Sequence, residues 1–119
     1  MTIVGVTEPP KGLEKLTQLE KLNLNGNQLT NVKGLEKLTQ LKGLSLYNNQ
    51  LTNVKGLEKL RQLEGLSLGK NQLTDVKGLE KLTQLVVLWL HDNPDLTKAQ
   101  IDELKKALPK CRIQSNPKK

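Results

Sequence analysis

Apolar and polar positions repeat along most of the chain with a period of 22 residues and no gap. Three full units stand in register: 19–40 (LEKLNLNGNQLTNVKGLEKLTQ), 41–62 (LKGLSLYNNQLTNVKGLEKLRQ) and 63–84 (LEGLSLGKNQLTDVKGLEKLTQ). A half-unit, KGLEKLTQ, precedes them at 11–18, and a fourth unit opens at residue 85 with LVVLWLHDN before the pattern breaks. A repeat of this size indicates one small supersecondary unit that is stacked on copies of itself.

The spacing of leucines within a unit predicts its local structure. Leu22 and Leu24 lie two residues apart, which is the period of a β-strand, so both point to the same side. After Gly34 the apolar residues recur every three positions, over a stretch too short for a stable α-helix, and a 3₁₀-like turn fits better. A chain that returns every 22 residues lays each strand beside the last, which predicts a parallel sheet along a coil.

One polar column recurs just after every predicted strand: Asn27, Asn49, Asn71 and Asn93. An asparagine side chain has both a donor and an acceptor. In the bend that leaves a strand, backbone N–H and C=O groups have no ladder partner, and burying one unpaired costs about 1–3 kcal/mol. We therefore interpret the four asparagines as a buried ladder that satisfies these groups, and not as an exposed ligand-binding column.

The pattern LxxLxLxxNxLTxVKGLEKLTQ resembles the 22-residue class of leucine-rich repeats, which occurs in bacterial internalins and in a nuclear regulatory subunit of a Ser/Thr phosphatase. The closing segment, NPDLTKAQIDELKKALPKCRI, is similar to the end of short bacterial proteins of this family. The resemblance implies an α/β fold, a leucine-rich-repeat solenoid with a parallel β-sheet on the concave face and 3₁₀ turns on the convex face. It also implies recognition of proteins by the concave side.

The C-terminal end departs from the repeat. One residue is inserted after Asn93, and Thr97 with Gln100 has the spacing of a capping box. A single helical face then gathers Ile101, Leu104, Ala107 and Leu108. We expect a C-terminal capping helix that ends at Pro109 and covers the last coil, followed by a last strand at 111–113.

The N-terminal end offers only an extended piece at 2–7, whose apolar residues Ile3, Val4 and Val6 predict a first strand. An edge that this piece does not cover would be free to pair with a second copy of the chain. We expect one domain over 1–119: an N-terminal cap and half-repeat (1–18), three full repeats (19–40, 41–62, 63–84), a last strand and turn (85–96), and a C-terminal cap and tail (97–119).

Composition adds limits to this picture. The net charge is +7, but seven basic and two acidic residues lie from Thr97 onward, against twelve and ten before it. The basic excess thus belongs to the C-terminal end, as a solvated cap or a contact for an anionic partner, and nucleic-acid binding by the repeats is not expected. No stretch predicts a membrane span or an export signal, and localisation stays open.

Chemistry-bearing residues are few. One cysteine and one histidine cannot build a structural zinc site, and we expect no metal and no cofactor. Cys111 lies between two basic residues and is read either as a reactive thiol or as filling in the capping strand. His91 beside Asp92, with Ser67 one strand away, lacks the geometry and oxyanion donors of a catalytic site, so no enzyme activity is expected. The lysine and glutamate columns of the convex side indicate a solvated face.

The outward strand positions define what the concave sheet presents. The columns are Lys21, Gly43, Gly65, Val87; then Asn23, Ser45, Ser67, Trp89; then Asn25, Tyr47, Gly69, His91; and, at the turn, Gly26, Asn48, Lys70, Asp92. Both aromatic residues of the protein are in this set, and aromatic side chains are favoured binding anchors. The candidate partner-binding residues are therefore Tyr47, Val87, Trp89, His91 and Lys70.

Two functions compete. In the first, the chain is a protein–protein interaction module whose concave patch holds a partner of unknown identity. In the second, the chain is a designed or recently duplicated scaffold without a dedicated ligand, since its repeats are nearly identical and Gly43, Gly65 and Gly69 are expected to leave much of the sheet bare. A third option is an anion-binding or membrane-surface role of the basic cap, whose affinity would fall steeply with salt. A homodimer through the N-terminal edge is a further possibility.

Overall fold

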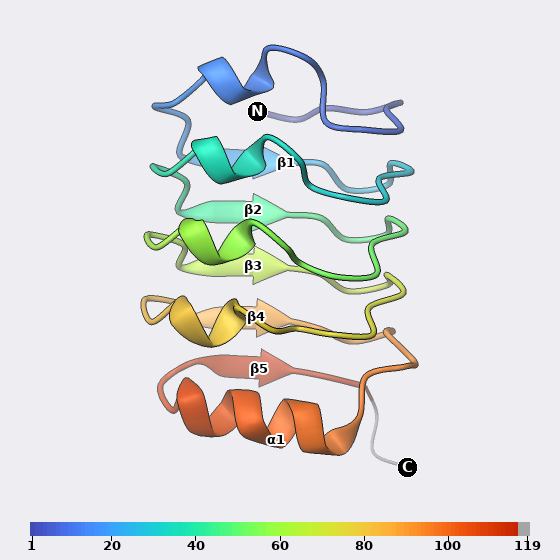
Figure 1. Ribbon diagram of the computed structural model, residues 1–119, viewed down its shortest axis with the longest axis vertical. Helices are drawn as coiled ribbons and strands as arrows, with labels where there is room; N and C mark the ends of the chain where they lie inside the picture. The colour runs from blue at the N-terminus through green and yellow to red at the C-terminus, as the bar shows by residue number, and fades with distance from the viewer. Residues whose placement is uncertain (117–119) are drawn as a thin grey trace.

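The computed structural model describes residues 1–116 and shows a coil that turns five times (Figure 1). Each of the first four turns carries a three-residue 3₁₀ segment, and the fifth carries an α-helix in its place. In chain order the elements are η1 Leu13–Lys15, β1 Lys21–Asn23, η2 Leu35–Lys37, β2 Gly43–Ser45, η3 Leu57–Lys59, β3 Gly65–Ser67, η4 Leu79–Lys81, β4 Val87–Trp89, α1 Lys98–Ala107 and β5 Arg112–Gln114. The predicted solenoid with 3₁₀ turns and a C-terminal helix is confirmed.

The five strands form one parallel sheet in the order β1-β2-β3-β4-β5. Neighbouring strands of the repeats pair residue i with residue i+22, as in Leu22 with Leu44, so the sequence period sets the register. The last pair is offset by more, with Leu88 opposite Ile113, because α1 is longer than the 3₁₀ segment it replaces. The central residue of each repeat strand is buried, and its two neighbours face away from the core.

The core lies between the sheet and the 3₁₀ segments, and leucine supplies most of it. Stacking identical coils places each leucine against its counterpart in the next coil, so one residue type can fill the interior without gaps. The fully buried side chains of the middle coils include Leu46, Leu51, Leu57, Leu60, Leu63, Leu66 and Leu68.

A glycine opens every 3₁₀ segment because its backbone is left-handed there. Gly34 has φ 94°, a conformation that other residues adopt only with strain. The carboxylate of Glu36, two residues later, accepts a hydrogen bond from the Gly34 N–H at 2.9 Å. The same bond recurs in all four coils that carry a 3₁₀ segment, at 2.8 Å between Gly56 and Glu58. The glutamate column of the convex side, predicted to be merely solvated, therefore also caps the 3₁₀ turns.

The asparagine ladder is confirmed. Asn49 is 6% exposed, and its Oδ1 accepts a hydrogen bond from the Leu29 N–H of the preceding coil. Its Nδ2 donates to the carbonyl of Leu24 in the preceding coil and to that of Leu46 in its own coil. Asn71 and Asn93 repeat this arrangement. Each asparagine thus joins two coils through buried backbone groups that would otherwise lack partners.

The C-terminal end is closed by α1, which lies over the last coil (Figure 1). Thr97 and Gln100 form the predicted capping box, with the Gln100 N–H donating to the Thr97 hydroxyl at 3.1 Å. Ile101, Leu104 and Leu108 are buried as expected, but Ala107 is exposed. The predicted last strand at 111–113 is displaced by one residue, to β5 at 112–114. Lys118 and Lys119, which add to the basic end, lie outside the described residues.

The N-terminal piece differs from the prediction. Residues 2–7 do not form a strand; Thr2 makes a single parallel bridge to Asn23 of β1. Two backbone hydrogen bonds support it, from the Asn23 N–H to the Met1 carbonyl and from the Ile3 N–H to the Asn23 carbonyl. Gly5, with φ 76°, then bends the chain, and Val4 is left 75% exposed. The backbone edge of β1 is therefore paired, while apolar side chains at this end stay in solvent.

Among residues 1–116 the structure contains no helix with the length and hydrophobicity of a membrane span.

Candidate functional site

The concave face, which we define as the side of the sheet that points away from the leucine core, presents two residues from each strand. Parallel pairing aligns them in columns: Lys21, Gly43, Gly65, Val87 and Arg112 in one, and Asn23, Ser45, Ser67, Trp89 and Gln114 in the other. None of these ten positions holds an acidic residue, and Lys21 and Arg112 are cationic. The columns predicted from the sequence are thus reproduced, and β5 extends them by one strand.

Trp89 and Val87 place the largest apolar surface of the concave face on β4. Trp89 is 39% exposed and Val87 is half-buried. On the adjoining strand β3 the register partners are Ser67 and Gly65, which are too small to cover the indole. An aromatic side chain that is exposed beside such small neighbours can bury a large area against a ligand.

Tyr47 and His91 form a ring pair at the end of the strands. Their ring centroids are 5.8 Å apart with an interplanar angle of 38°, although their strands, β2 and β4, are not neighbours. The rings meet across Gly69, where a Cβ would lie 2.8 Å from two ring atoms of His91 and 3.1 Å from Tyr47. Only glycine leaves room for both rings here.

Gly69 was therefore predicted wrongly as a bare position of the sheet. It is buried, and the two rings cover it. The sequence contained the signal, since Gly69 stands between Tyr47 and His91 in one column. Gly43 and Gly65 do remain uncovered in part, as expected.

Lys70 follows Gly69 in a left-handed turn with φ 54°. Its N–H donates to the His91 carbonyl at 2.9 Å, and its side chain is exposed. The equivalent turn residue of the first coil is Gly26, with φ 69°. A lysine in this backbone conformation carries strain that glycine avoids. Of the five predicted residues, Val87 and Trp89 therefore share β4, Tyr47 and His91 touch, and Lys70 joins His91 through its backbone.

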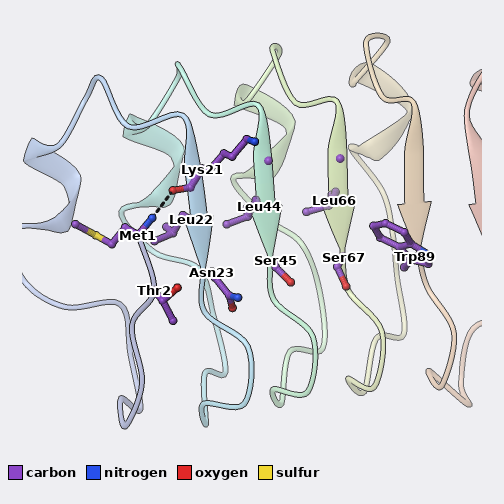
Figure 2. Close-up of a pocket in the computed structure, with 12 residues that line it drawn as sticks. Met1, Thr2, Lys21, Leu22, Asn23, Leu44, Ser45, Leu66, Ser67 and Trp89 are labelled. Carbon is purple, nitrogen blue, oxygen red and sulfur yellow. Dashed lines mark hydrogen bonds between the residues drawn. The ribbon is translucent and has the colours of Figure 1, made fainter.

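An open hollow of about 400 Å³ lies beside this patch (Figure 2). Its floor consists of β2 and β3, where glycine and serine leave the backbone bare. Figure 2 shows Lys21 and Met1 on one side of the hollow and Trp89 on the other. We call this feature the glycine bowl and define it by Lys21, Gly43, Ser45, Gly65, Ser67 and Trp89. Lys21 and the two serines were not among the predicted site residues, because no single one of them looks unusual in the sequence.

Hydrogen bonds fix one rim of the bowl. The Oδ1 atom of Asn25 accepts from the Ser45 hydroxyl and, at 2.9 Å, from the Tyr47 N–H. The Oδ1 atom of Asn23 accepts from the Asn25 N–H at 2.8 Å. These bonds hold polar side chains of the first strands against the backbone, so the rim is ordered before any ligand arrives.

The remaining reactive groups do not converge on the bowl. No group of three histidine, cysteine or acidic side chains that could hold a metal occurs in residues 1–116. Cys111 is half-buried against the core, and its burial raises the pKa of the thiol. The raised pKa disfavours the reactive thiolate, despite the flanking Lys110 and Arg112. The pKa of Glu58 on the convex side is lowered, mainly by a hydrogen bond from its own backbone N–H.

Comparison with known proteins places this architecture among repeat proteins. A family model described as leucine-rich repeats (2 copies) matches residues 17–59 and again 61–106. No curated protein matches the chain.

Three solved bacterial structures share the fold. A leucine-rich-repeat protein of Leptospira interrogans is 37% identical, with a TM-score of 0.83 over 91% of this chain and 28% of that one. The internalin inlF of Listeria monocytogenes is 25% identical, with a TM-score of 0.82 over 93% of this chain and 34% of that one. Internalin C2 of the same species is 28% identical, with a TM-score of 0.82 over 91% and 46%. The chain thus spans less than half the length of each of these structures.

Proposed function

Because the chain belongs to the leucine-rich-repeat family, we propose that it is a protein-binding module that holds its partner on the concave face near the C-terminal end. Tyr47, Val87, Trp89, His91 and Lys70 are the contacting residues in this proposal. Its main support is Trp89, a large aromatic side chain left 39% exposed on an ordered sheet. Aromatic residues of this kind contribute a disproportionate share of binding free energy in protein interfaces.

The strain at Lys70 also supports the proposal. A left-handed lysine costs about 1–2 kcal/mol relative to the ordinary backbone, and such a cost is commonly found where function requires a particular side chain. Lys70 lies beside His91 at the rim of the patch, where its charge is exposed to a partner.

We propose binding and not catalysis as the activity, with a protein and not a nucleic acid as the ligand. The two cationic side chains of the concave strands, Lys21 and Arg112, lie on β1 and β5, roughly 19 Å apart at a strand spacing of about 4.8 Å. A nucleic-acid backbone calls for a continuous row of positive charge. Two separated charges around an aromatic centre suit a protein surface better.

A cross-linking pull-down from bacterial lysate tests the proposal with three proteins: the intact chain, Trp89→Ala and the control Val86→Ala. Val86 is 62% exposed in the same coil but does not occupy an outward position of the concave strands. A partner retained by the intact chain and by Val86→Ala, and lost from Trp89→Ala, is the expected result. Equal retention by all three, or none by any, would favour the alternative of a duplicated or designed scaffold without a dedicated ligand.

We also propose that the N-terminal end associates with a second copy of the chain. Met1, Val4 and Leu16 are 54%, 75% and 41% exposed there, so a dimer would bury three apolar side chains. Sedimentation velocity over a hundredfold range of concentration is expected to show a dimer that Leu16→Glu abolishes. A monomer at every concentration would contradict this second proposal and leave the first one intact.

A further inference from the structure

The glycine bowl has the form of a socket for a single side chain. Gly43 and Gly65 leave two adjacent strands without side chains, and Ser45 and Ser67 add only hydroxymethyl groups. The hollow, at about 400 Å³, falls in the ~300–1,000 Å³ range of ligand sites. Its lining is mainly apolar, and the Trp89 ring stands at its C-terminal side (Figure 2).

Packing does not require glycine at the two floor positions of the bowl. A Cβ at Gly43 would meet the Lys21 side chain at 3.7 Å, and one at Gly65 would meet Val87 at 3.9 Å, both ordinary contact distances. Neither glycine has a positive φ. Glycine weakens a strand relative to larger residues. The fold would thus accept side chains at both positions, in contrast to Gly69, where the rings of Tyr47 and His91 exclude them.

Charge on the concave face selects the kind of occupant. Lys21 lies at one side of the bowl, and Arg112 lies beyond Trp89 on β5. With no acidic residue among the ten outward strand positions, the electrostatic field over this face attracts carboxylates. An occupant with an apolar group in the bowl and an acidic group on either side would satisfy both cations.

Strand geometry sets the spacing of such an occupant. Strands lie about 4.8 Å apart, so the centre of the bowl, between β2 and β3, is roughly 7 Å from Lys21 and roughly 12 Å from Arg112. An extended peptide rises about 3.3 Å per residue and alternates its side chains. Acidic residues two positions before and four positions after an aromatic residue would all face the sheet at the required distances.

We propose that the glycine bowl binds an extended acidic peptide segment of a partner protein, which crosses the strands and inserts an aromatic side chain against Trp89. The two flanking acidic residues pair with Lys21 and Arg112. This inference rests on the proposed protein-binding function and names the chemistry of the partner's docking segment.

Trp89 is the single tryptophan of the protein, so its fluorescence reports on the bowl directly. The probe is the peptide Asp-Ser-Phe-Ser-Gly-Ser-Asp, acetylated and amidated at its ends. Two control peptides replace both Asp by Lys, or Phe by Ala. The acidic aromatic peptide is expected to shift the Trp89 emission and to bind at least tenfold more tightly than either control. No shift up to millimolar peptide, or equal binding of the acidic and basic peptides, would overturn the proposal.

Variants that fill the bowl separate binding from folding. Gly65→Val places a branched side chain on the floor and suits a strand, so we expect at least a tenfold loss of peptide affinity without loss of stability. Gly65→Ala, the matched control, should lose less than threefold. Lys21→Glu should reverse the preference and favour the lysine-ended peptide. Undiminished binding by Gly65→Val, with the fold verified by circular dichroism, would also overturn the proposal.

The pull-down distinguishes this inference from the proposed function. If Gly65→Val still retains a partner that Trp89→Ala loses, the concave face binds protein but the bowl is not its socket. If the peptide forms the expected complex and no lysate partner depends on Trp89, the bowl recognises acidic aromatic segments, and only the claim that this lysate supplies the partner is overturned. Peptide-independent self-association of the intact chain, abolished by Gly65→Val, would assign the bowl to a second copy and refute the peptide.

Discussion

The hydrophobic layer of the terminal coil is covered differently at the two ends of the solenoid. At the C-terminal end α1 covers the last coil, and Leu82 is fully buried. At the N-terminal end the equivalent leucine of the first coil, Leu16, is 41% exposed. Both ends nevertheless satisfy their backbone: Asn27 bonds to Ile3 and Val6, and Asn116 exchanges two hydrogen bonds with the backbone of Asn93.

The difference shows that closing a hydrogen-bond ladder and closing a hydrophobic layer are separate tasks. A few residues of extended chain accomplish the first, because each needs only to present one donor or acceptor. The second needs a broad apolar face, which α1 provides and residues 1–6 do not. Since local stability follows buried apolar contact, hydrogen exchange should be fastest at the N-terminal coil.

The largest expected effect comes from opening the covered end. Leu104 is 4% exposed at the centre of the α1 face, and Leu104→Ala should lower the free energy of unfolding by about 2–5 kcal/mol, measured by urea denaturation. Leu16→Ala at the other end should cost well under half as much, since much of that side chain is already in water. Similar losses for the two variants would contradict the comparison.

Removing the N-terminal hydrogen bonds should have the next effect. Asn27→Ala leaves the Val6 N–H and the Ile3 carbonyl without their partner and removes one of the two hydrogen bonds to the Leu24 carbonyl, and we expect a loss of about 1–3 kcal/mol. The amide of Val6 should also exchange faster with solvent. The control Asn31→Ala removes the side-chain oxygen that accepts an exposed turn hydrogen bond from the Lys33 N–H, and it should cost only a few tenths of the loss expected for Asn27→Ala. An equal loss from both variants would show that the ladder contributes nothing specific.

The cap of α1 is expected to contribute about 1 kcal/mol. Thr97→Ala removes the hydroxyl that accepts from the Gln100 N–H, and losses of roughly 0.5–2 kcal/mol are typical for such caps. Thermal unfolding would measure it, with Thr83→Ala at an exposed turn as the control. A fall no greater than that of the control would indicate that packing alone orients α1.

The left-handed turn after each strand provides a reciprocal test between the first and the third coil. Lys70→Gly should stabilise the protein by up to about 1 kcal/mol by relieving backbone strain, and Gly26→Lys should destabilise it by about 1 kcal/mol. If Lys70 is a binding residue, the more stable Lys70→Gly variant will retain less partner in the pull-down. An unchanged stability in both exchanges would mean that the turn tolerates lysine without cost.

The smallest effect concerns pH and the exposed surface of α1. The Lys98 ammonium, 2.7 Å from Asp102, lowers the pKa of that carboxyl. A lowered pKa in the folded state means that the contribution is present above the ordinary carboxyl pKa of about 4 and is lost as the pH falls through the folded value. Asp102→Asn should remove this small part of the acid dependence of unfolding, and added salt should weaken it in the unmodified chain.

Most of the fold could be predicted because the 22-residue period sets register, strand direction and core together. The asparagine ladder followed from the same regularity, since a polar residue that recurs beside buried leucines needs buried partners. The position of β5 could not be obtained this way, because α1 interrupts the period and Leu88 pairs with Ile113. Asn116 was missed for the same reason: it lies after the break and matches no column of the sequence.

The candidate site was predicted only in part. The columns identified the exposed aromatic residues, because alternation alone decides which strand positions face outward. Neither the covering of Gly69 nor the hollow at Gly43 and Gly65 follows from alternation. The three glycines lie on one sheet but have different surroundings, because different side chains extend over each of them from strands one or two places away. Such reach depends on rotamers and sheet shape, which a repeat pattern does not contain.

The asparagine ladder also determines the order in which the coils can be completed during synthesis. Each coil receives its closing hydrogen bonds from the asparagine of the coil that follows it, as Leu29 does from Asn49. On a ribosome, which delivers the chain from the N-terminus, a coil therefore stays incomplete until about one more repeat has emerged. Every newly made coil is completed only by the coil that follows it, and the coil that carries Asn93 is completed by Asn116 and α1.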